Sequence, residues 1–246
     1  MLKTYGFLEQ LIGSLAFSVF SLLEWFNKKF SLVGNHCFFE LDHFSWVYEV
    51  ENQFSFIREE LDNIINHDNI PNFQDISKGQ EALTQDDKWK AFLMYANGHK
   101  IEGNCVKCPR TVEALEKIPN IKTAFFSIIY PHKHIPPHRG PFNGILRYHL
   151  GLIIPSDRKS CRIRVGDQNR HWEEGKSIIF DDTWNHEAWN DSDQVRVVLF
   201  VDFLRPLPFL IKYLNIGFIS FIREFPFIRK ALRTYALTQA SWRVGA

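Results

Sequence analysis

The sequence predicts a mainly β fold, a sandwich or barrel with flanking α-helices, and three observations lead to this prediction. From Thr123 to Phe203, short runs of β-branched and aromatic residues alternate with turn residues. Before and after this region, apolar residues recur at helical spacing. The chain has 246 residues, of which 45% are hydrophobic and 23% charged, so it can bury one substantial core.

The central region, residues 35–205, is predicted to be one domain. Two helices come first: one is marked by Phe54, Ile57, Leu61, Ile64 and Ile65, and the other by Val112, Leu115 and Ile118, ending at Pro119. Short strands with turns between them then favour a sandwich or barrel, including the double-sheet jelly roll. The predicted strands are Ala124–Tyr130, Leu146–Ile154, Arg162–Val165, Arg170–Trp172, Ser177–Phe180, Glu187–Trp189 and Val195–Phe203.

The N-terminal segment, residues 1–34, is predicted to be an apolar helix. Its uncharged run from Gln10 to Leu23 spans 14 residues, whereas a membrane-spanning helix needs about 20. No convincing signal peptide is present. Two interpretations stay open: a helix packed on the core, and an interfacial helix that lies in the headgroup layer of a membrane.

The C-terminal segment, residues 206–246, combines aromatic and basic residues. From Phe203 to the end there are seven basic residues, opposed only by Glu224. The uncharged run from Tyr213 to Ile222 is ten residues, too short to span a bilayer. A helix packed on the sheet would not need this surplus of positive charge, so the pattern favours an amphipathic element at a membrane surface.

Charge and cysteine content bound the partners and the compartment. The net charge of +1 gives no argument for a nucleic-acid partner, and none is expected. Cys105 and Cys108 form a single CxxC pair, and a structural zinc ion would need two further ligands, so ordinary thiols in a turn are favoured. Free thiols suit the cytosol. We therefore expect a cytoplasmic protein, peripheral on the inner face of a membrane.

Polar residues occur in the predicted strands where core residues are expected. Alternation places Arg147, His149 and Gly151 on one face of their strand, and Arg196 is the only charge in Val195–Leu199, the β-branched start of the last strand. An arginine that points into a sandwich must meet an anion, because an unpaired buried charge is costly. A small dicarboxylate fits such a site. Ion pairs within the protein explain the inward arginines equally well, and the candidate acids are Asp181, Asp182 and Asp202.

Histidines cluster just before these strands. His132, His134 and His138 lie in a predicted loop over 132–141, and His186 follows 48 residues after His138. Non-haem iron oxygenases usually bind the metal through two histidines and one carboxylate, but the carboxylate position after His138 holds Gly140. The spacing alone therefore also allows a cupin-like structural metal site at His132 and His134, or loop histidines that are simply solvated.

Several motifs, in order, resemble the aspartyl/asparaginyl β-hydroxylase family. The resemblance runs from Lys88 to Pro206 and is carried by HRGPFN at 138–143, LRYHLGL at 146–152, CRIR at 161–164, WEEGK at 172–176, IFDD at 179–182, HEAW at 186–189, Val195-Arg196 and Val201-Asp202. Lys88-Trp89-Lys90 and Cys108-Pro109-Arg110-Thr111 are similar to the family's upstream segments.

The resemblance implies a double-stranded β-helix (jelly roll) core, Fe(II) as cofactor and 2-oxoglutarate as cosubstrate. It implies that His138 and His186 are the only protein ligands of the iron, because the family has a glycine where the carboxylate would stand. It assigns the 2-oxoglutarate site to Ser127, Arg147, His149 and Arg196. Arg196 and Ser127 would hold the distal carboxylate, and Arg147 and His149 would lie near the carboxylate that chelates iron. Asp181 and Asp182 either orient His186 or form a plain acidic turn.

These assignments imply an iron(II)/2-oxoglutarate-dependent dioxygenase that uses molecular oxygen to hydroxylate an unactivated carbon. The apolar termini favour an acyl chain of a membrane lipid, as in the family's lipid A hydroxylase-like members. A peptide or a free amino acid, hydroxylated at aspartate or asparagine, is the alternative substrate. A catalytically silent jelly-roll binding module is the other alternative, and intact His138, His186 and Arg196 argue against it.

Overall fold

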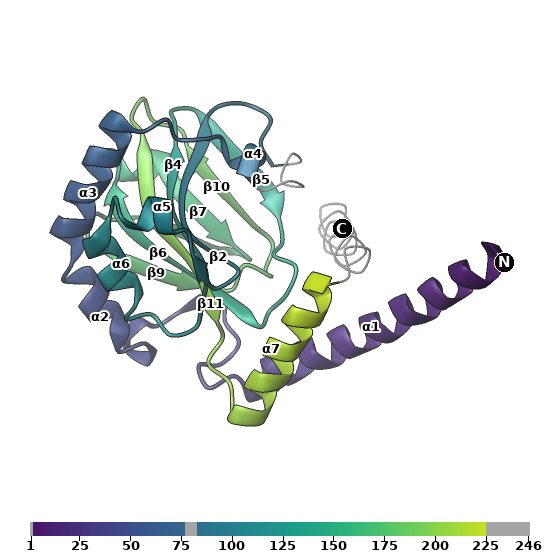
Figure 1. The fold of residues 1–246 in the computed structure, drawn as a ribbon. Helices are drawn as coiled ribbons and strands as arrows, with labels where there is room; N and C mark the ends of the chain where they lie inside the picture. Colours follow the sequence, from purple (N-terminus) through teal and green to yellow (C-terminus); the bar gives the residue numbers. More distant parts are fainter. Residues whose placement is uncertain (1, 77–82, 225–246) are drawn as a thin grey trace. The chain divides into compact units, whose positions relative to one another are not determined.

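The computed structural model describes residues 2–76 and 83–224, and these fall into two compact units (Figure 1). The β unit consists of residues 36–138 and 145–204. The described part of the helical unit consists of residues 2–35, 139–144 and 205–224.

Two antiparallel sheets form the β unit. The large sheet has the order β1 (Phe38–Phe39), β9 (Ser177–Phe180), β6 (Ile145–Ile153), β11 (Arg196–Leu204), β4 (Ile121–Ile129), β2 (Trp89–Ala96) and β3 (His99–Lys100). The small sheet has the order β5 (Lys133–His138), β10 (His186–Asn190), β7 (Cys161–Val165) and β8 (Gln168–His171). From β4 to β11 the chain passes back and forth between the two sheets, which is the path of a double-sheet jelly roll. The predicted fold class is confirmed.

The histidine-bearing segment before β6 is a strand, so the prediction of a loop over 132–141 is wrong. Pro136 and Pro137 suggested a loop, because proline cannot donate a hydrogen bond to a neighbouring strand. However, β5 is the edge strand of the small sheet, the position where a strand tolerates proline. The strand β2 was also missed, because its burial on both faces removes the alternation that marks a half-buried strand.

The core of the β unit lies between the sheets and is rich in aromatic rings. Phe125 and Phe200, on neighbouring strands, stack with centroids 4.2 Å apart. Phe73, in the short helix α4 (Phe73–Ile76), stacks on Trp89 at 4.0 Å. Trp172, between β8 and β9, is 1% exposed and belongs to the same cluster. Polar groups on this inner face are therefore shielded from water.

Helices cover the other face of the large sheet (Figure 1). They are α2 (Trp46–Glu51), α3 (Phe54–His67) and α6 (Pro109–Leu115). Trp46 of α2 packs on Tyr148 of β6 and Phe203 of β11, with ring centroids 5.1 and 5.3 Å apart. The predicted helix at 54–65 is confirmed. The other predicted helix ends at Leu115 rather than at Pro119. The remaining short helices are η1 (Leu41–His43), α5 (Glu102–Cys105) and η2 (Arg158–Ser160).

The helical unit is built from α1 (Leu2–Phe30), α7 (Phe209–Glu224) and the connecting loop 139–144. Phe20, Phe142 and Phe218 bring these three segments together, with ring centroids 5.6 to 6.0 Å apart. One asparagine from each of the three segments joins a buried hydrogen-bond network, in which Asn27 donates to Asn143 (3.0 Å) and Asn215 (2.9 Å). Among the described residues, none of the helices combines the length and apolar character needed to cross a bilayer.

Candidate active site

Two histidines lie side by side on neighbouring strands of the small sheet. His138 is the last residue of β5 and His186 is the first residue of β10, and the antiparallel register pairs them directly. Residues paired in this way project to the same face of a sheet. Their ring centroids are 4.0 Å apart. The structure therefore brings together the two residues that the resemblance implies as metal ligands.

Backbone carbonyls orient both rings. Nδ1 of His138 donates to the carbonyl of Pro136 at 2.8 Å, and Nδ1 of His186 donates to the carbonyl of Trp184 at 3.0 Å. With the proton on Nδ1, each Nε2 carries a lone pair, which is the usual arrangement of a metal-binding histidine. Burial lowers the pKa of His138 to about 4 and lowers the pKa of His186 well below its ordinary value. Both rings are therefore neutral at neutral pH.

The donor set is small. The described part of the chain contains no group of three or more histidine, cysteine, aspartate or glutamate side chains that could hold a metal ion. Gly140, two residues after His138, has no side chain to offer. Two neutral imidazoles fit a metal that takes the rest of its coordination sphere from cosubstrate and water.

A buried arginine on the inner face of the large sheet lacks a counter-ion. Arg196 at the start of β11 is 3% exposed, and its Nε and Nη1 have no hydrogen-bond partner among the described residues. Burial lowers the pKa of Arg196 to about 10, which still leaves the group charged at neutral pH. Isolated buried charges are costly. The site therefore suits an anion.

Ser127 and His149 share this inner face with Arg196. In the register, Arg196 pairs with Ile129, and Ser127 lies two residues before Ile129 on β4, so both side chains point to the same side. His149 pairs with Phe200 of β11, whose ring belongs to the core between the sheets. Nε2 of His149 also has no partner in the described part of the chain. Burial and the charge of Arg196 lower the pKa of His149 well below its ordinary value, so the ring is neutral.

The second inward arginine differs, because its charge is balanced by acids. Arg147 forms ion pairs with Asp202 directly across the strand pair (2.9 Å) and with Asp182 (2.8 Å). Of the two interpretations that the sequence left open, internal ion pairing describes Arg147, whereas the anion site at Arg196 stays a prediction. A role of Arg147 beside the cosubstrate stays a prediction.

The two acids before His186 have separate partners. Asp181 accepts hydrogen bonds from the backbone N–H (3.0 Å) and the hydroxyl (2.6 Å) of Thr183, so it stabilises the turn. Asp182 pairs with Arg147. The hydrogen bond that orients His186 goes to the Trp184 carbonyl. The acidic-turn interpretation therefore describes Asp181.

The other histidines of the cluster lie at the surface and pair with acids. Nε2 of His132 contacts Asp193 at 2.9 Å, and Nε2 of His134 contacts Glu187 at 2.9 Å. Their side chains are 60% and 45% exposed. The structure does not bring these two rings together on a shared ligand, so it gives no support to the cupin-like metal site at His132 and His134.

The cysteine pair is also accounted for by backbone contacts. The thiols of Cys105 and Cys108 are buried and free, and they donate to the carbonyls of Met94 (3.3 Å) and Asn104 (3.4 Å). Burial raises the pKa of Cys108 to about 12. These contacts are compatible with the ordinary thiols that the sequence favours.

Sequence reasoning missed two tryptophans of the site. Trp89 donates from Nε1 to the Ser127 hydroxyl at 3.1 Å, and Trp172 contacts both His149 and Arg196. Both stand in motifs that carry the family resemblance. Composition and periodicity give no further signal for these two residues, since a buried tryptophan is ordinarily interpreted as part of the hydrophobic core.

Comparisons with known proteins identify the family. The family model described as Aspartyl/Asparaginyl beta-hydroxylase matches residues 51–206. An "Ornithine lipid ester-linked acyl 2-hydroxylase" of Rhizobium tropici is 44% identical over 199 residues, 80% of this chain and 71% of that protein. The human "Aspartyl/asparaginyl beta-hydroxylase" is 38% identical over 131 residues, which are 51% of this chain but only 17% of the human protein.

Solved structures resemble parts of the fold. The non-haem α-ketoglutarate-dependent epimerase SnoN from nogalamycin biosynthesis superposes with a TM-score of 0.42 at 13% identity, over 63% of this chain and 76% of that one. With its matched family model and a relative aligned over most of both lengths, the chain belongs to the aspartyl/asparaginyl β-hydroxylase family of hydroxylases.

Proposed function

We propose that the protein is an Fe(II)- and 2-oxoglutarate-dependent dioxygenase that hydroxylates an acyl chain of a membrane lipid. The observation that carries the proposal is the pairing of two neutral, correctly oriented histidines with an uncompensated arginine in one interior. The Phe180 ring lies between the candidate anion site and the histidine pair. Its centroid is 5.1 Å from that of His149 and 6.0 Å from that of His186. A chelating dicarboxylate suits both sites at once.

In this proposal the residues divide the work between the two ends of the cosubstrate. Arg196 grips the distal carboxylate with in-plane N–H groups, assisted by the Ser127 hydroxyl. His149 donates from Nε2 toward the other end, beside Arg147. His138 and His186 present their Nε2 lone pairs to the iron. When bound, iron with 2-oxoglutarate and dioxygen supplies the oxidant for an unactivated C–H bond. The aromatic side chains around these polar residues keep bulk water out of the site.

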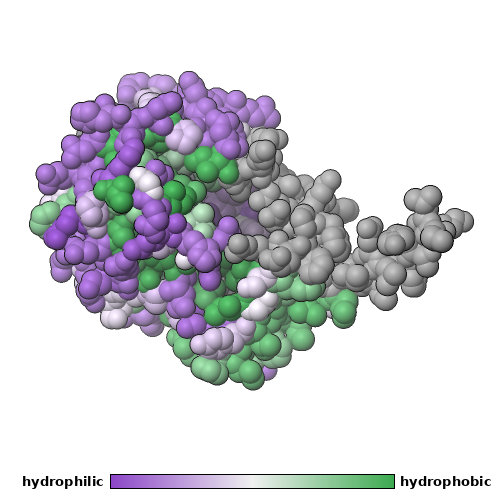
Figure 2. Space-filling view, in the orientation of Figure 1, coloured by the Kyte–Doolittle hydropathy of each residue, from purple (hydrophilic) through white to green (hydrophobic). Residues whose placement is uncertain are grey.

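The helical unit supports a lipid as the substrate. Apolar side chains along α1 and α7 are exposed: Leu15, Leu22, Trp25, Phe209, Leu210, Tyr213 and Leu214 are each at least half exposed. Figure 2 shows apolar residues gathered over α7 and the adjoining end of α1, whereas hydrophilic residues predominate over the β unit. Exposed apolar patches of this kind mark interaction surfaces.

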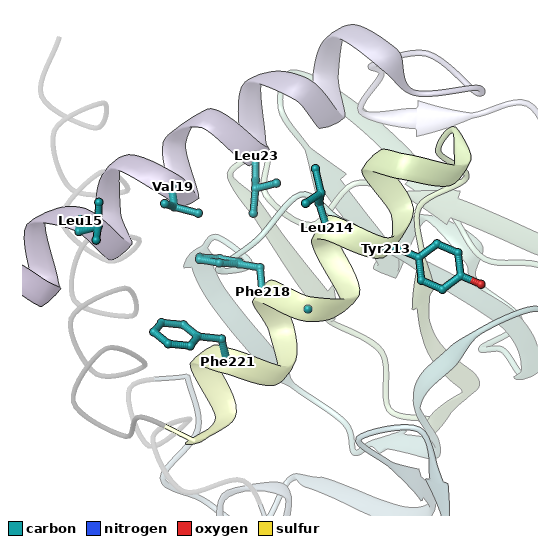
Figure 3. Close-up of a pocket in the computed structure, with 8 residues that line it drawn as sticks. Leu15, Val19, Leu23, Tyr213, Leu214, Phe218 and Phe221 are labelled. Atoms are coloured by element: carbon teal, nitrogen blue, oxygen red, sulfur yellow. The ribbon is translucent and has the colours of Figure 1, made fainter.

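A groove runs between the two helices and has a volume of about 410 Å³. Figure 3 shows Leu15, Val19 and Leu23 of α1 along one side and Leu214, Phe218 and Phe221 of α7 along the other. Lys28 and Lys29 stand at the end of α1, and Lys29 lies 4.6 Å over the Trp25 ring. Aromatic and aliphatic residues beside lysines are typical of a helix in the headgroup layer.

The relative from Rhizobium tropici, named as an acyl 2-hydroxylase of ornithine lipid, supports the same substrate class. We propose that the protein lies on the cytoplasmic face of a membrane, where its buried free thiols remain reduced. Aspartate or asparagine of a peptide is the competing substrate, since the human relative is named for it.

The test uses purified protein, Fe(II), 2-oxoglutarate and oxygen, with lipid vesicles in one arm and aspartate- and asparagine-containing peptides in the other. Succinate formation and a mass increase of one oxygen are measured in both arms, with a His138→Ala/His186→Ala variant as control. We expect the oxygen in a lipid acyl chain. Oxygen in the peptide would overturn the lipid assignment. Succinate no higher than in the control variant, in every arm, would overturn the dioxygenase itself.

A further inference from the structure

Trp172 contacts two residues of the candidate anion site, His149 and Arg196. Its indole Nε1–H donates to Nδ1 of His149, at 3.3 Å. Its ring lies against Arg196, with the guanidinium carbon 4.4 Å from the ring centroid. Trp172 itself is 1% exposed, in the segment between β8 and β9, so its orientation is held by the core. One side chain therefore organises two groups that come from β6 and β11.

The contact with His149 determines which nitrogen carries the proton. A neutral imidazole has one donor nitrogen and one acceptor nitrogen, and indole can only donate. Nδ1 of His149 must therefore be the acceptor, which leaves the proton on Nε2. Nε2 is the atom that has no partner among the described residues. In the opposite tautomer a lone pair at Nε2 would repel a carboxylate.

The contact with Trp172 leaves two donor atoms of Arg196, Nε and Nη1, without a hydrogen-bond partner among the described residues. A cation held against the face of an indole interacts through the π-system and uses none of its N–H groups. Nε and Nη1 of Arg196 have no hydrogen-bond partner in the described part of the chain, so both remain available to a carboxylate. Without the indole ring beside it, the long side chain of Arg196 would sample more conformations and bind the anion more weakly.

We propose that Trp172 is a positioning residue of the anion site, which holds His149 as the Nε2–H tautomer and orients Arg196 so that both donate to one bound dicarboxylate. The identity of the dicarboxylate as 2-oxoglutarate rests on the proposed function. The tautomer and the arrangement of donors do not depend on iron. The site thereby favours an anion that only accepts hydrogen bonds over a neutral ligand of the same shape.

Tautomers are measured first, by long-range ¹H–¹⁵N NMR of the histidine side chains in the metal-free protein. The His149 signals are assigned by their loss in His149→Gln. We expect His149 to be the Nε2–H tautomer in the wild type and a mixture of tautomers in Trp172→Phe, which keeps an aromatic face but has no donor. A wild-type His149 protonated at Nδ1 would overturn the proposal by itself, even if no variant folds.

Ligand binding is measured by calorimetry on the same metal-free protein with 2-oxoglutarate and glutarate, which has two carboxylates but no 2-oxo group to chelate iron. Loss of one buried hydrogen bond is expected to weaken binding about tenfold in Trp172→Phe. Trp172→Leu removes the aromatic face as well and should weaken it further, by about three- to tenfold. Unchanged affinity in a folded Trp172→Phe overturns the proposal, as does failure of the wild type to bind either dicarboxylate.

Trp189 provides a matched control. It stacks on His134 with centroids 5.0 Å apart and lies 4.4 Å from the Arg162 guanidinium, so it has the same kinds of partner on an exposed face of the small sheet. Trp189→Phe should leave both affinities unchanged. In a His149→Gln background, where no tautomer has to be set, Trp172→Phe should cost less than in the wild type. Equal costs in the two backgrounds would exclude the tautomer role.

Because these measurements contain no iron, they separate this inference from the proposed function. If the expected tautomer and dicarboxylate affinities are found but no succinate forms, the role of Trp172 is supported and the dioxygenase proposal is refuted. A protein that forms succinate normally with Trp172→Phe, and binds 2-oxoglutarate as the wild type does, would keep the dioxygenase and lose the role of Trp172.

Discussion

The β unit and the helical unit leave opposite kinds of group without a partner. In the β unit, N–H groups of Arg196 and His149 are buried in an apolar core with no acceptor among the described residues. In the helical unit, Phe209 and Leu210 are apolar yet 77% and 70% exposed. A buried charge without a counter-ion and apolar side chains in water both cost free energy. The buried, unpaired donors of the β unit therefore suit an anion, whereas the exposed side chains of the helical unit suit an apolar partner.

Two other arginines of low exposure in the described part of the chain have acceptors for their N–H groups. Arg147 has two acids as partners. Arg205 of the helical unit, 1% exposed, donates to the carbonyls of Asn143 (2.6 Å) and Gly34 (3.1 Å). Arg196 differs from both, because its Nε and Nη1 have no acceptor among the described residues, and these donors mark the candidate anion site.

The largest expected effect comes from the histidine pair. His138→Ala or His186→Ala should reduce both iron binding and succinate formation by more than about a hundredfold, the upper range for partners that only support a metal ligand. His134→Ala, which removes a surface ring paired with Glu187, is the control and should behave as the wild type. Iron content after anaerobic loading and succinate release measure the effect. Wild-type turnover in both variants would show that the ligand assignment is wrong.

Removing the arginine that is already paired should affect stability. Arg147→Ala leaves the buried Asp182 and the half-buried Asp202 without their cation, and we expect it to lower the free energy of unfolding by about 3 kcal/mol. Arg196→Leu, which removes a cation that lacks an acid, should lower it by less or raise it. Urea unfolding of the two variants in the absence of ligand makes the measurement. Equal losses of stability would break the contrast between the two arginines.

Removing the unpaired arginine should instead affect the cosubstrate. Arg196→Ala is expected to weaken 2-oxoglutarate binding at least about thirtyfold, since a buried arginine–carboxylate pair typically contributes on the order of 2–5 kcal/mol. Iron binding should be largely kept. Arg196→Lys should restore only part of the affinity, because an ammonium cannot make the paired contact of a guanidinium. Unchanged cosubstrate affinity in folded Arg196→Ala would refute the anion site.

The smallest expected effect concerns the helical unit. Phe209→Ser with Leu210→Ser should weaken binding to anionic vesicles about tenfold, because burying each such side chain contributes about 1.5–3 kcal/mol when complete and insertion here is partial. Raising the salt concentration should weaken binding of the wild type without abolishing it, since salt screens the lysines but not apolar insertion. Vesicle sedimentation measures both.

Val106 is the control for this experiment, because it is an exposed apolar residue of the β unit, at 72%. Val106→Ser should leave vesicle binding unchanged. Folded wild-type protein that stays in the supernatant at low salt would end the membrane proposal and remove its support for a lipid substrate.

Elements with a local signal could be predicted from the amino-acid sequence. Alternation in β6 placed Arg147 and His149 on one face, and the apolar spacing at 54–65 marked a helix, because side-chain direction follows from strand and helix period alone. The order of motifs identified the family and singled out His138, His186 and Arg196. The strand and helix periods depend on residues that are neighbours in the chain, and the family motifs depend only on their order along it.

Features that depend on contacts between residues far apart in the chain could not be predicted in this way. Only the pairing of strands shows that β5 is an edge strand, which explains why Pro136 and Pro137 do not prevent it from forming. Only the packing of side chains shows that Arg147 meets two acids while Arg196 meets the ring of Trp172. No local period encodes these contacts, because a buried charge is satisfied by whichever group the fold brings beside it.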